Sequence, residues 1–404
     1  PAQDWRVMHY EGGRYRQGEP HGVGTLTLGG STYEGQFVHG DATGIGRMTS
    51  ADEVLEGDFD GGLPHGAVVT TNPKNPGVYC CATYREGELH GDSMDIALKP
   101  PRLTSFRQFE DGRRVGFCQV YDAFGGSVMG EVNRSGDLTG DSVAYLFPDG
   151  RHGIVGRFKK GNLVHGEQVR FSKRVERRVK VKIASRRPAS RGHFCARHGE
   201  DWIIFDMSSF RPLTEVPKSK VVGEAVNLDV STSSCLSLQP RVADVYETAT
   251  VSVRMSLMPG AGEGLFAKRT IYAWEYCAWY NGTRCTHQDV NARNWEECSN
   301  TITLDKRVVL DVPRPFARAK VYCATLGHKA NHHRPNNARY EAFEHPRFGM
   351  IKCVQAITRI RPGEEVCVDY GYGSERPAWY TDPELDDAAT GKAKAPGRGG
   401  AGSG

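Results

Sequence analysis

The sequence lacks two features that would place it in large classes of proteins. No apolar run approaches the length of about 20 residues that a membrane-spanning helix needs. Residues 1–5 also lack the basic and then apolar pattern of a signal peptide. We therefore expect neither a transmembrane segment nor secretion, but a protein of the nucleus or the cytosol.

Cysteine pairs are missing as well. The chain has 11 cysteines, but no two of them form a Cys-x-x-Cys pair. Structural zinc sites usually draw their ligands from such closely spaced pairs, so we predict no metal site. Scattered cysteines of this kind are typical of free thiols in a reducing compartment, where most pack as small hydrophobic side chains.

Charge is nearly balanced over the chain but uneven along it. The chain of 404 residues is long enough for two or three domains. Its formal charge is +4. Residues 167–199 hold eleven Lys or Arg against two Asp or Glu. This excess fits a solvated strand face followed by a linker. It equally fits a nuclear-targeting signal or a contact of residues 170–197 with nucleosomal DNA phosphates, and the sequence leaves these alternatives open.

The first 170 residues contain an internal repeat. Glycines recur every 22 to 26 residues, at Gly22, Gly44, Gly66, Gly91, Gly116, Gly140 and Gly166. Between them lie alternating apolar and polar segments such as Tyr33-Glu34-Gly35-Gln36-Phe37. So short a period predicts β-hairpins that bury their apolar faces by stacking on one another. The pattern resembles MORN repeats, and we expect the glycines to serve turns, not phosphate binding.

Four separated motifs lie in the last third of the chain. In order they are Ala261-Gly262-Glu263-Gly264-Leu265-Phe266, Trp279-Tyr280-Asn281-Gly282, Asn300-Thr301-Ile302-Thr303-Leu304-Asp305, and Gly327-His328-Lys329-Ala330-Asn331-His332 followed by Tyr340 and residues 364–372. Any one of them alone would be weak. Their order and spacing resemble the MORN-repeat SET-domain histone-lysine methyltransferases, the group that monomethylates lysine four of histone H3.

The resemblance implies a mainly β protein, in which an array of MORN-repeat hairpins precedes a knotted β SET domain with few short helices. We expect the repeat array in residues 1–170, a basic and connecting pre-SET region in 171–248, the SET catalytic domain in 249–372, and a largely disordered C-terminal segment in 373–404. It also implies S-adenosylmethionine as cofactor, a histone H3 tail or another lysine-bearing peptide as substrate, association with chromosomes, and a monomeric enzyme.

Methyl transfer to lysine makes defined chemical demands. The amine must be neutral, and at a pKa of about 10.4 its deprotonation at pH 7 costs about 4 to 5 kcal/mol. An apolar channel lowers that pKa, and tyrosines suit it because each combines an apolar ring face with a polar hydroxyl. By resemblance, Tyr370 orients the amine, while Tyr280 and Tyr340 line the channel and limit how many methyl groups fit.

The same resemblance assigns two further sets of residues. Cofactor binding falls to Ala261, Gly262, Glu263, Lys329, Asn331, His332, Trp379 and Glu384. Substrate binding falls to Asn291, Thr301, Thr303, Lys352 and Tyr372, with residues 300–303 as an edge strand that an extended peptide can join. For His332 we expect a hydrogen-bonding role, not metal ligation, because no second ligand lies at helical spacing.

Two departures from the family pattern keep an alternative open. The run His332-His333-Arg334-Pro335-Asn336 places its proline one position early, which predicts a locally altered crossing. In addition, the family's acidic cofactor partner aligns with Pro383, next to Glu384. The alternative is a MORN-repeat scaffold that binds a partner or acidic lipid and carries an idle SET module.

Overall fold

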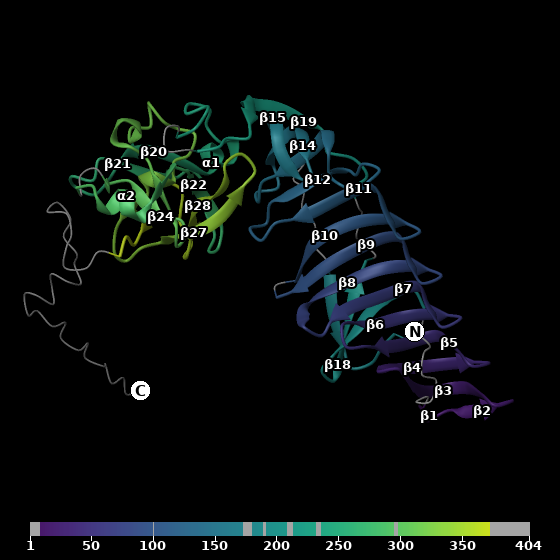
Figure 1. The fold of residues 1–404 in the computed structure, drawn as a ribbon. Helices are drawn as coiled ribbons and strands as arrows, with labels where there is room; N and C mark the ends of the chain where they lie inside the picture. The colour runs from purple at the N-terminus through teal and green to yellow at the C-terminus, as the bar shows by residue number, and fades with distance from the viewer. Residues whose placement is uncertain are drawn as a thin grey trace, which may run out of the picture. The chain divides into compact units, whose positions relative to one another are not determined.

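The structure is a computed structural model that describes residues 9–99, 101–172, 180–188, 191–207, 213–231, 236–294 and 298–371. The chain forms two compact units, Pro1–Val221 and Val222–Gly404. Strands dominate both units, as Figure 1 shows, and the prediction of a mainly β protein is confirmed. The expected tail, residues 373–404, lies outside the described residues.

One long sheet runs through the first unit, and its last strand extends past Val221 (Figure 1). Its strands are β1 (His9–Glu11), β2 (Arg14–Arg16), β3 (Glu19–Leu28), β4 (Ser31–Val38), β5 (Asp41–Thr49), β6 (Val54–Asp60), β7 (Leu63–Asn72), β8 (Asn75–Arg85), β9 (Glu88–Leu98), β10 (Pro101–Glu110), β11 (Arg113–Tyr121), β12 (Ser127–Glu131), β13 (Gly140–Leu146), β14 (His152–Lys159), β15 (Asn162–Phe171) and β19 (Ser219–Asn227). From β3 to β15 each strand pairs with the next in sequence. The hairpin array predicted from the glycine period is therefore present.

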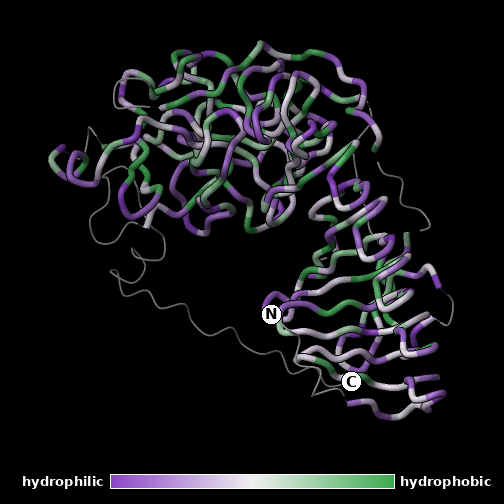
Figure 2. Tube along the Cα trace, turned by 45° about the vertical axis from the view of Figure 1, so that its right-hand side comes forward, coloured by the Kyte–Doolittle hydropathy of each residue, from purple (hydrophilic) through white to green (hydrophobic). Residues whose placement is uncertain are grey.

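Glycine lets aromatic rings lie across this sheet. A Cβ added to Gly46 would come within 2.1 Å of the Tyr33 hydroxyl, and one added to Gly35 within 2.6 Å. The Tyr33 ring covers both positions and meets Phe37 and Phe59 edge to face, with ring centroids 5.2 and 5.0 Å apart. Figure 2 shows hydrophilic residues at many turns of the array and apolar residues along its strands.

A small sheet covers part of the long one within the first unit. It comprises β16 (Lys180–Ala184), β18 (Asp201–Asp206) and β17 (Phe194–His198) in that order. Ile203 and Phe205 of β18 join a buried cluster with Phe106 and Phe117 of the long sheet. The basic segment of the sequence thus contributes an ordered strand, β16, to this sheet.

The second unit consists of short strands around one core. Its elements are α1 (Val245–Thr250), β20 (Val251–Met255), β21 (Glu263–Ala267), β22 (Tyr276–Tyr280), β23 (Thr283–Thr286), α2 (His287–Asn291), β24 (Thr301–Thr303), β25 (Val308–Asp311), the 3-10 helices η3 (Arg314–Phe316) and η4 (Gly327–Lys329), β26 (Asn331–His332), β27 (Ala338–His345), β28 (Gly349–Ala356) and β29 (Cys367–Val368). Small two- and three-stranded sheets, among them β22-β28-β27 and β23-β25-β24, surround a cluster that includes Leu265, Ala278 and Val354. This arrangement brings the separated sequence motifs together.

The two halves of the fourth motif cross where β26 pairs in parallel with β29. Asn337 holds the crossing: its Nδ2 donates to the Glu365 carbonyl at 2.8 Å, and its Oδ1 accepts from the Cys367 amide at 2.8 Å. The Arg334–Pro335 bond in the intervening loop is cis, and the Arg334 guanidinium pairs with Asp369 at 2.9 Å. The early proline therefore leaves the crossing itself in place.

Candidate active site

Three tyrosines converge beside the crossing. Tyr280 ends β22, Tyr340 lies on β27, and Tyr370 follows β29. The Tyr370 hydroxyl donates to the Ala330 carbonyl at 2.7 Å, and the Tyr340 hydroxyl lies 3.1 Å from the Gly327 carbonyl. The rings of Tyr280 and Tyr340 meet edge to face with centroids 5.8 Å apart. Aromatic walls and backbone carbonyls thus surround one small region.

The environment keeps the inner two hydroxyls protonated. Burial, and secondarily the nearby Tyr370, raise the pKa of both Tyr280 and Tyr340 well above the usual value. Tyr370 is 39% exposed, whereas Tyr280 is only 3% exposed. The group therefore runs from the protein surface at Tyr370 to a buried end, with neutral hydroxyls that act as hydrogen-bond donors at neutral pH.

Close packing at the buried end depends on a glycine. A Cβ added to Gly327 would lie 2.6 Å from the Trp279 carbonyl oxygen and 3.0 Å from the Tyr280 Cβ. Glycine therefore lets η4 approach β22, which places the Gly327 carbonyl where the Tyr340 hydroxyl reaches it.

Charged and amide groups gather at the start of β21. Lys329 Nζ lies 2.9 Å from Glu263 Oε2. Burial opposes ionisation of Glu263, but Lys329 and the Ala319 amide outweigh it and lower the pKa of that carboxyl. Asn331 Nδ2 donates to the Glu263 carbonyl at 3.2 Å. Three of the predicted cofactor residues therefore lie in mutual contact.

Glycine is required at positions 262 and 264 for different structural reasons. Gly262 has a φ of +72°, and no atom lies within 4 Å of an added Cβ, so the turn leaves open space beside the backbone. At Gly264 an added Cβ would come 2.3 Å from Glu365 Oε1. Ala261 lies in the same turn, where its amide donates to the Met258 carbonyl at 3.2 Å.

His332 is fully buried and positions the backbone beside Tyr370. Its Nδ1 accepts a hydrogen bond from the Tyr370 amide at 3.0 Å and lies 3.5 Å from Asp369 Oδ1. Among the described residues, no group of three or more His, Cys, Asp or Glu side chains is arranged to hold a metal ion.

The predicted substrate residues lie on neighbouring elements of the second unit. β24, with Thr301 and Thr303, is the edge strand of the sheet β23-β25-β24, and the Tyr280 hydroxyl donates to the carbonyl of Asn300 just before it at 2.6 Å. Lys352 pairs with Tyr280 across β28 and β22. Asn291 is exposed at the end of α2.

Three of the predicted residues cannot be placed. Tyr372, Trp379 and Glu384 all lie beyond residue 371, outside the described part of the chain. Their assignment to substrate or cofactor binding stays a prediction.

Sequence reasoning missed two buried carboxyl groups of this region. Glu365 accepts from Asn331 Nδ2 at 3.1 Å and from the Ser256 hydroxyl at 2.7 Å. It stands inside a recognised motif, and the facing Gly264 was the signal that a side chain packs there.

The second missed group is Glu247, on α1. Its Oε1 accepts from the Trp279 amide at 2.7 Å and from the Leu326 amide at 2.8 Å. These amides directly precede Tyr280 and Gly327, so one carboxyl joins the two segments that form the buried end of the site. Burial, aided by Asp244, raises the pKa of Glu247 well above the usual value.

Comparisons with known proteins agree with this geometry. A SET-domain family model matches residues 262–371, and one described as the N-terminal region of the histone H3 K4-specific methyltransferase SET7 matches residues 109–182. The histone-lysine N-methyltransferase SETD7 of Halocynthia roretzi is 34% identical over 291 residues, which are 70% of this chain and 67% of that protein. The chain belongs to the SETD7 family of histone-lysine methyltransferases.

The similarity to SETD7 extends over more of the chain than the SET domain alone. It covers most of both chains, so the hairpin array and the SET domain belong to one known combination. Among solved structures, a chain of a humanized Chaetomium thermophilum Polycomb Repressive Complex 2 mutant, bound to the inhibitor GSK343, is 24% identical. That match covers 30% of this chain and 15% of that chain, with a TM-score of 0.24.

Proposed function

We propose that this SETD7-family enzyme transfers one methyl group from S-adenosylmethionine to a lysine of histone H3, at lysine four, and acts on other lysine-bearing proteins as well. The observation that carries the proposal is the convergence of three tyrosines: the hydroxyls of Tyr340 and Tyr370 bind the carbonyls of Gly327 and Ala330, and the ring of Tyr280 meets that of Tyr340 edge to face. A nuclear, chromosome-associated enzyme is the corresponding expectation, supported by the histone substrate named for the relative. A monomeric state stays a prediction.

The residues at the start of β21 suit the amino-acid end of S-adenosylmethionine. That end carries a carboxylate and an ammonium group, and Lys329 and Glu263 offer one charge of each sign. The open space beside Gly262 lets a ligand approach the backbone closely. When bound, the cofactor supplies an electrophilic methyl group on a sulfonium. Lys329, Glu263 and Asn331 would hold it through charge and hydrogen bonds.

The tyrosines would prepare the lysine amine. The buried ring of Tyr280 and the partly buried ring of Tyr340 form an environment that disfavours the ammonium form and lowers the lysine pKa. The Tyr370 hydroxyl, fixed on the Ala330 carbonyl, stands where it can orient the neutral amine. The hydroxyls of Tyr340 and Tyr370 are held by the Gly327 and Ala330 carbonyls, and this fixed arrangement supports a limit of one methyl group.

The substrate peptide would add a strand to the edge of the second unit. β24 has β25 on one side and pairs with no other described strand. An extended peptide can use such an edge for main-chain hydrogen bonds. The bond from Tyr280 to the Asn300 carbonyl ties this edge to the tyrosine group. Thr301, Thr303, Asn291 and Lys352 are the side chains we propose for contacts with the peptide.

The basic segment supports a second proposal, contact with nucleosomal DNA. Lys180, Lys182 and Arg186 are exposed, but Lys182 pairs with Asp206 at 2.9 Å. The Arg187 guanidinium is engaged internally, because it stacks on Trp202 and donates to Cys195 Sγ at 3.1 Å. Residues 173–179 and 189–190 lie outside the described part of the chain. Lys180 and Arg186 therefore support this proposal as exposed cations.

One experiment separates the enzyme from the scaffold alternative. Titration calorimetry with S-adenosylmethionine, followed by radiolabelled methyl transfer to core histones and lysine peptides, tests binding and chemistry in turn. The proposal predicts cofactor binding and labelled histone H3. Failure to bind the cofactor, or binding without any transfer, would favour a MORN-repeat scaffold with an idle SET module.

A further inference from the structure

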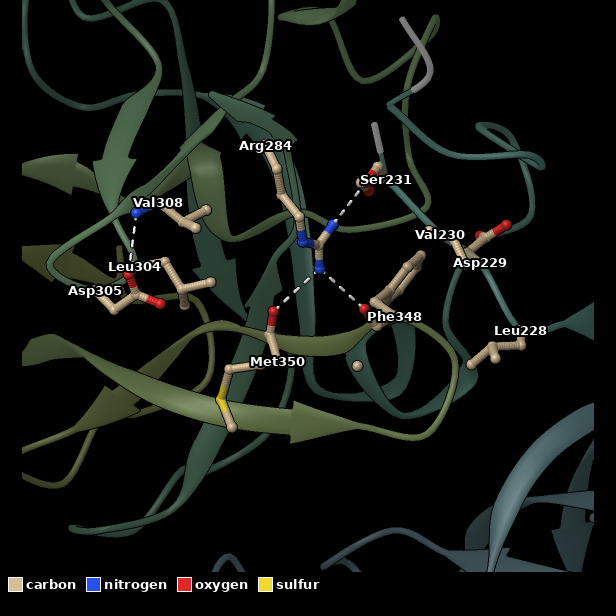
Figure 3. A pocket seen from close by; sticks show the side chains of 11 residues that line it. Leu228, Asp229, Val230, Ser231, Arg284, Leu304, Asp305, Val308, Phe348 and Met350 are labelled. Atoms are coloured by element: carbon tan, nitrogen blue, oxygen red, sulfur yellow. Dashed lines mark hydrogen bonds between the residues drawn. The ribbon is translucent and has the colours of Figure 1, made fainter. Parts of the chain in front are cut away.

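A pocket of about 420 Å³ opens in the second unit (Figure 3), and none of the described residues assigned to cofactor or substrate lines it. Its walls are largely apolar. Leu228, Val230, Leu304, Val308 and Met350 line it, together with the side chain of Arg284. Figure 3 shows Arg284 between the segment of Val230 on one side and that of Leu304 on the other. A polar cation thus stands within an otherwise apolar hollow.

Arg284 makes only neutral hydrogen bonds there. Its guanidinium donates to the carbonyls of Ser231, Phe348 and Met350, at 3.4, 3.2 and 3.1 Å. A guanidinium has five N–H donors, so these bonds leave donors for a ligand. Among the described residues, none offers a carboxylate within 4.0 Å of it. Burial lowers the pKa of Arg284, but an arginine stays charged.

Two acidic side chains line the pocket, and both are bound within the protein. Asp229 pairs with the Arg347 guanidinium at 2.8 Å and accepts from the Ser237 hydroxyl at 2.7 Å. Asp305 Oδ1 accepts from the amides of Arg307 and Val308, at 2.7 and 3.0 Å. These bonds lower the pKa of Asp305 and hold its carboxylate in the turn between β24 and β25. The cation of Arg284 is therefore left to interact with an external carboxylate.

The pocket adjoins both strands that carry residues proposed to contact the peptide. Leu304 directly follows Thr303 of β24, and Met350 precedes Lys352 of β28 by two residues. The tyrosine group lies at the other end of β24, where the Tyr280 hydroxyl binds the Asn300 carbonyl. From Asn300 to Leu304 an extended chain covers about 13 Å, at roughly 3.3 Å per residue. A peptide paired with β24 covers the same distance in about four residues.

We propose that this pocket is a second subsite for the substrate polypeptide, which receives an apolar side chain and an adjacent carboxylate about four residues from the methylated lysine. The proposal rests on the proposed methyltransferase function and narrows its substrate class. Apolar walls bury the aliphatic or aromatic group, and the Arg284 guanidinium binds the carboxylate. The direction of the peptide along β24 decides whether these residues precede or follow the lysine.

Peptide kinetics with the full chain test the subsite. The peptides carry one lysine, with Leu-Asp placed four and five residues before it, or after it, and matched peptides carry Leu-Asn or Gly-Asn. We expect Leu-Asp on one side only to lower KM about tenfold relative to Gly-Asn. The kcat should stay equal, because the amine enters the same group of tyrosines.

Variants connect this preference to the pocket. Arg284→Gln should abolish the advantage of Leu-Asp over Leu-Asn, measured as a ratio within each enzyme. Should that variant fold poorly, Val230→Asp places a carboxylate at an exposed position on the rim, and it should make Leu-Lys the preferred pair. Arg359→Gln, on another surface of the second unit, is the matched control and should keep the wild-type ratio.

Three outcomes would overturn the proposal. Equal kcat/KM for all methylated peptides in the wild type would remove the subsite and leave the methyltransferase function intact. Absence of transfer to every peptide would overturn the proposed function and the subsite with it. A change of sedimentation coefficient in Val230→Asp, without a changed peptide preference, would show that the pocket is a contact between copies of the chain.

Discussion

Replacing Glu247 by glutamine should change how stability depends on pH. Glutamine keeps an oxygen acceptor for the amides of Trp279 and Leu326, which Glu247 Oε1 binds at 2.7 and 2.8 Å. What it removes is the proton. The folded carboxyl keeps that proton far above its ordinary pKa of 4.5, because burial raises its pKa. In the unfolded chain the same carboxyl ionises near 4.5.

The sign and size of the effect follow from this difference. Above pH 4.5 the unfolded wild type releases a proton that the folded protein retains, so raising the pH favours unfolding. Each pH unit should cost the wild type about 1.4 kcal/mol relative to the glutamine variant, until the folded carboxyl ionises. Between about pH 5 and pH 7 the difference should therefore change by roughly 3 kcal/mol. Asp244, Tyr322 and Cys277 adjoin Glu247 but are common to both proteins and largely cancel.

Urea unfolding at pH 5, 6 and 7, followed by tryptophan fluorescence, measures the difference. Hydrogen exchange at the Trp279 and Leu326 amides assigns it to the second unit. Glu247→Ala serves as comparison: it removes the acceptor for two buried amides and should destabilise by roughly 1 to 3 kcal/mol per amide at every pH. Parallel pH profiles for wild type and Glu247→Gln would refute a protonated Glu247.

The other predictions concern chemistry and partners. Tyr370→Phe should lower kcat by about 10² with little change in cofactor affinity, because its hydroxyl acts on the amine; near-normal turnover would contradict this. Tyr340→Phe removes a hydroxyl held by the Gly327 carbonyl and should admit a second methyl group. Trimethylated product from the wild type would contradict the idea that the space beside the tyrosine hydroxyls limits the number of methyl groups. Replacing Lys180, Lys182 and Arg186 by Gln should weaken nucleosome binding and flatten its dependence on log salt by up to roughly 0.9 for each phosphate no longer neutralised, without affecting short peptides; equal salt slopes would exclude the DNA interaction.

Much of the first unit could be predicted from local sequence. A β-hairpin is set by neighbouring residues, and the period of the glycines is visible in the sequence alone. The ring of Tyr33 over Gly35 and Gly46 shows why the repeat also needs glycine within strands, a point that spacing does not reveal. Charge was less informative: Arg187 and Arg197 both stack on Trp202, and a count of basic residues treats them as free cations.

In the second unit, the limits of sequence reasoning lay with backbone and buried groups. The motifs identified Tyr280 and Tyr340. The carbonyls of Gly327 and Ala330, which accept hydrogen bonds from tyrosine hydroxyls, belong to the backbone, so residue types do not reveal them. Glu247 sits in a short capped helix that reads like any exposed turn of helix. Only its distances to two distant amides reveal that it is buried and holds the site together.

The central claim is methyl transfer to a lysine through the group formed by Tyr280, Tyr340 and Tyr370. The most direct measurement is mass spectrometry of histone H3 after incubation with the full chain and S-adenosylmethionine, beside the Tyr370→Phe variant. The account predicts a single added methyl group on one lysine of H3 in the wild type, and far less product in the variant. Unmodified H3 despite demonstrated cofactor binding, or equal product from both enzymes, would contradict it.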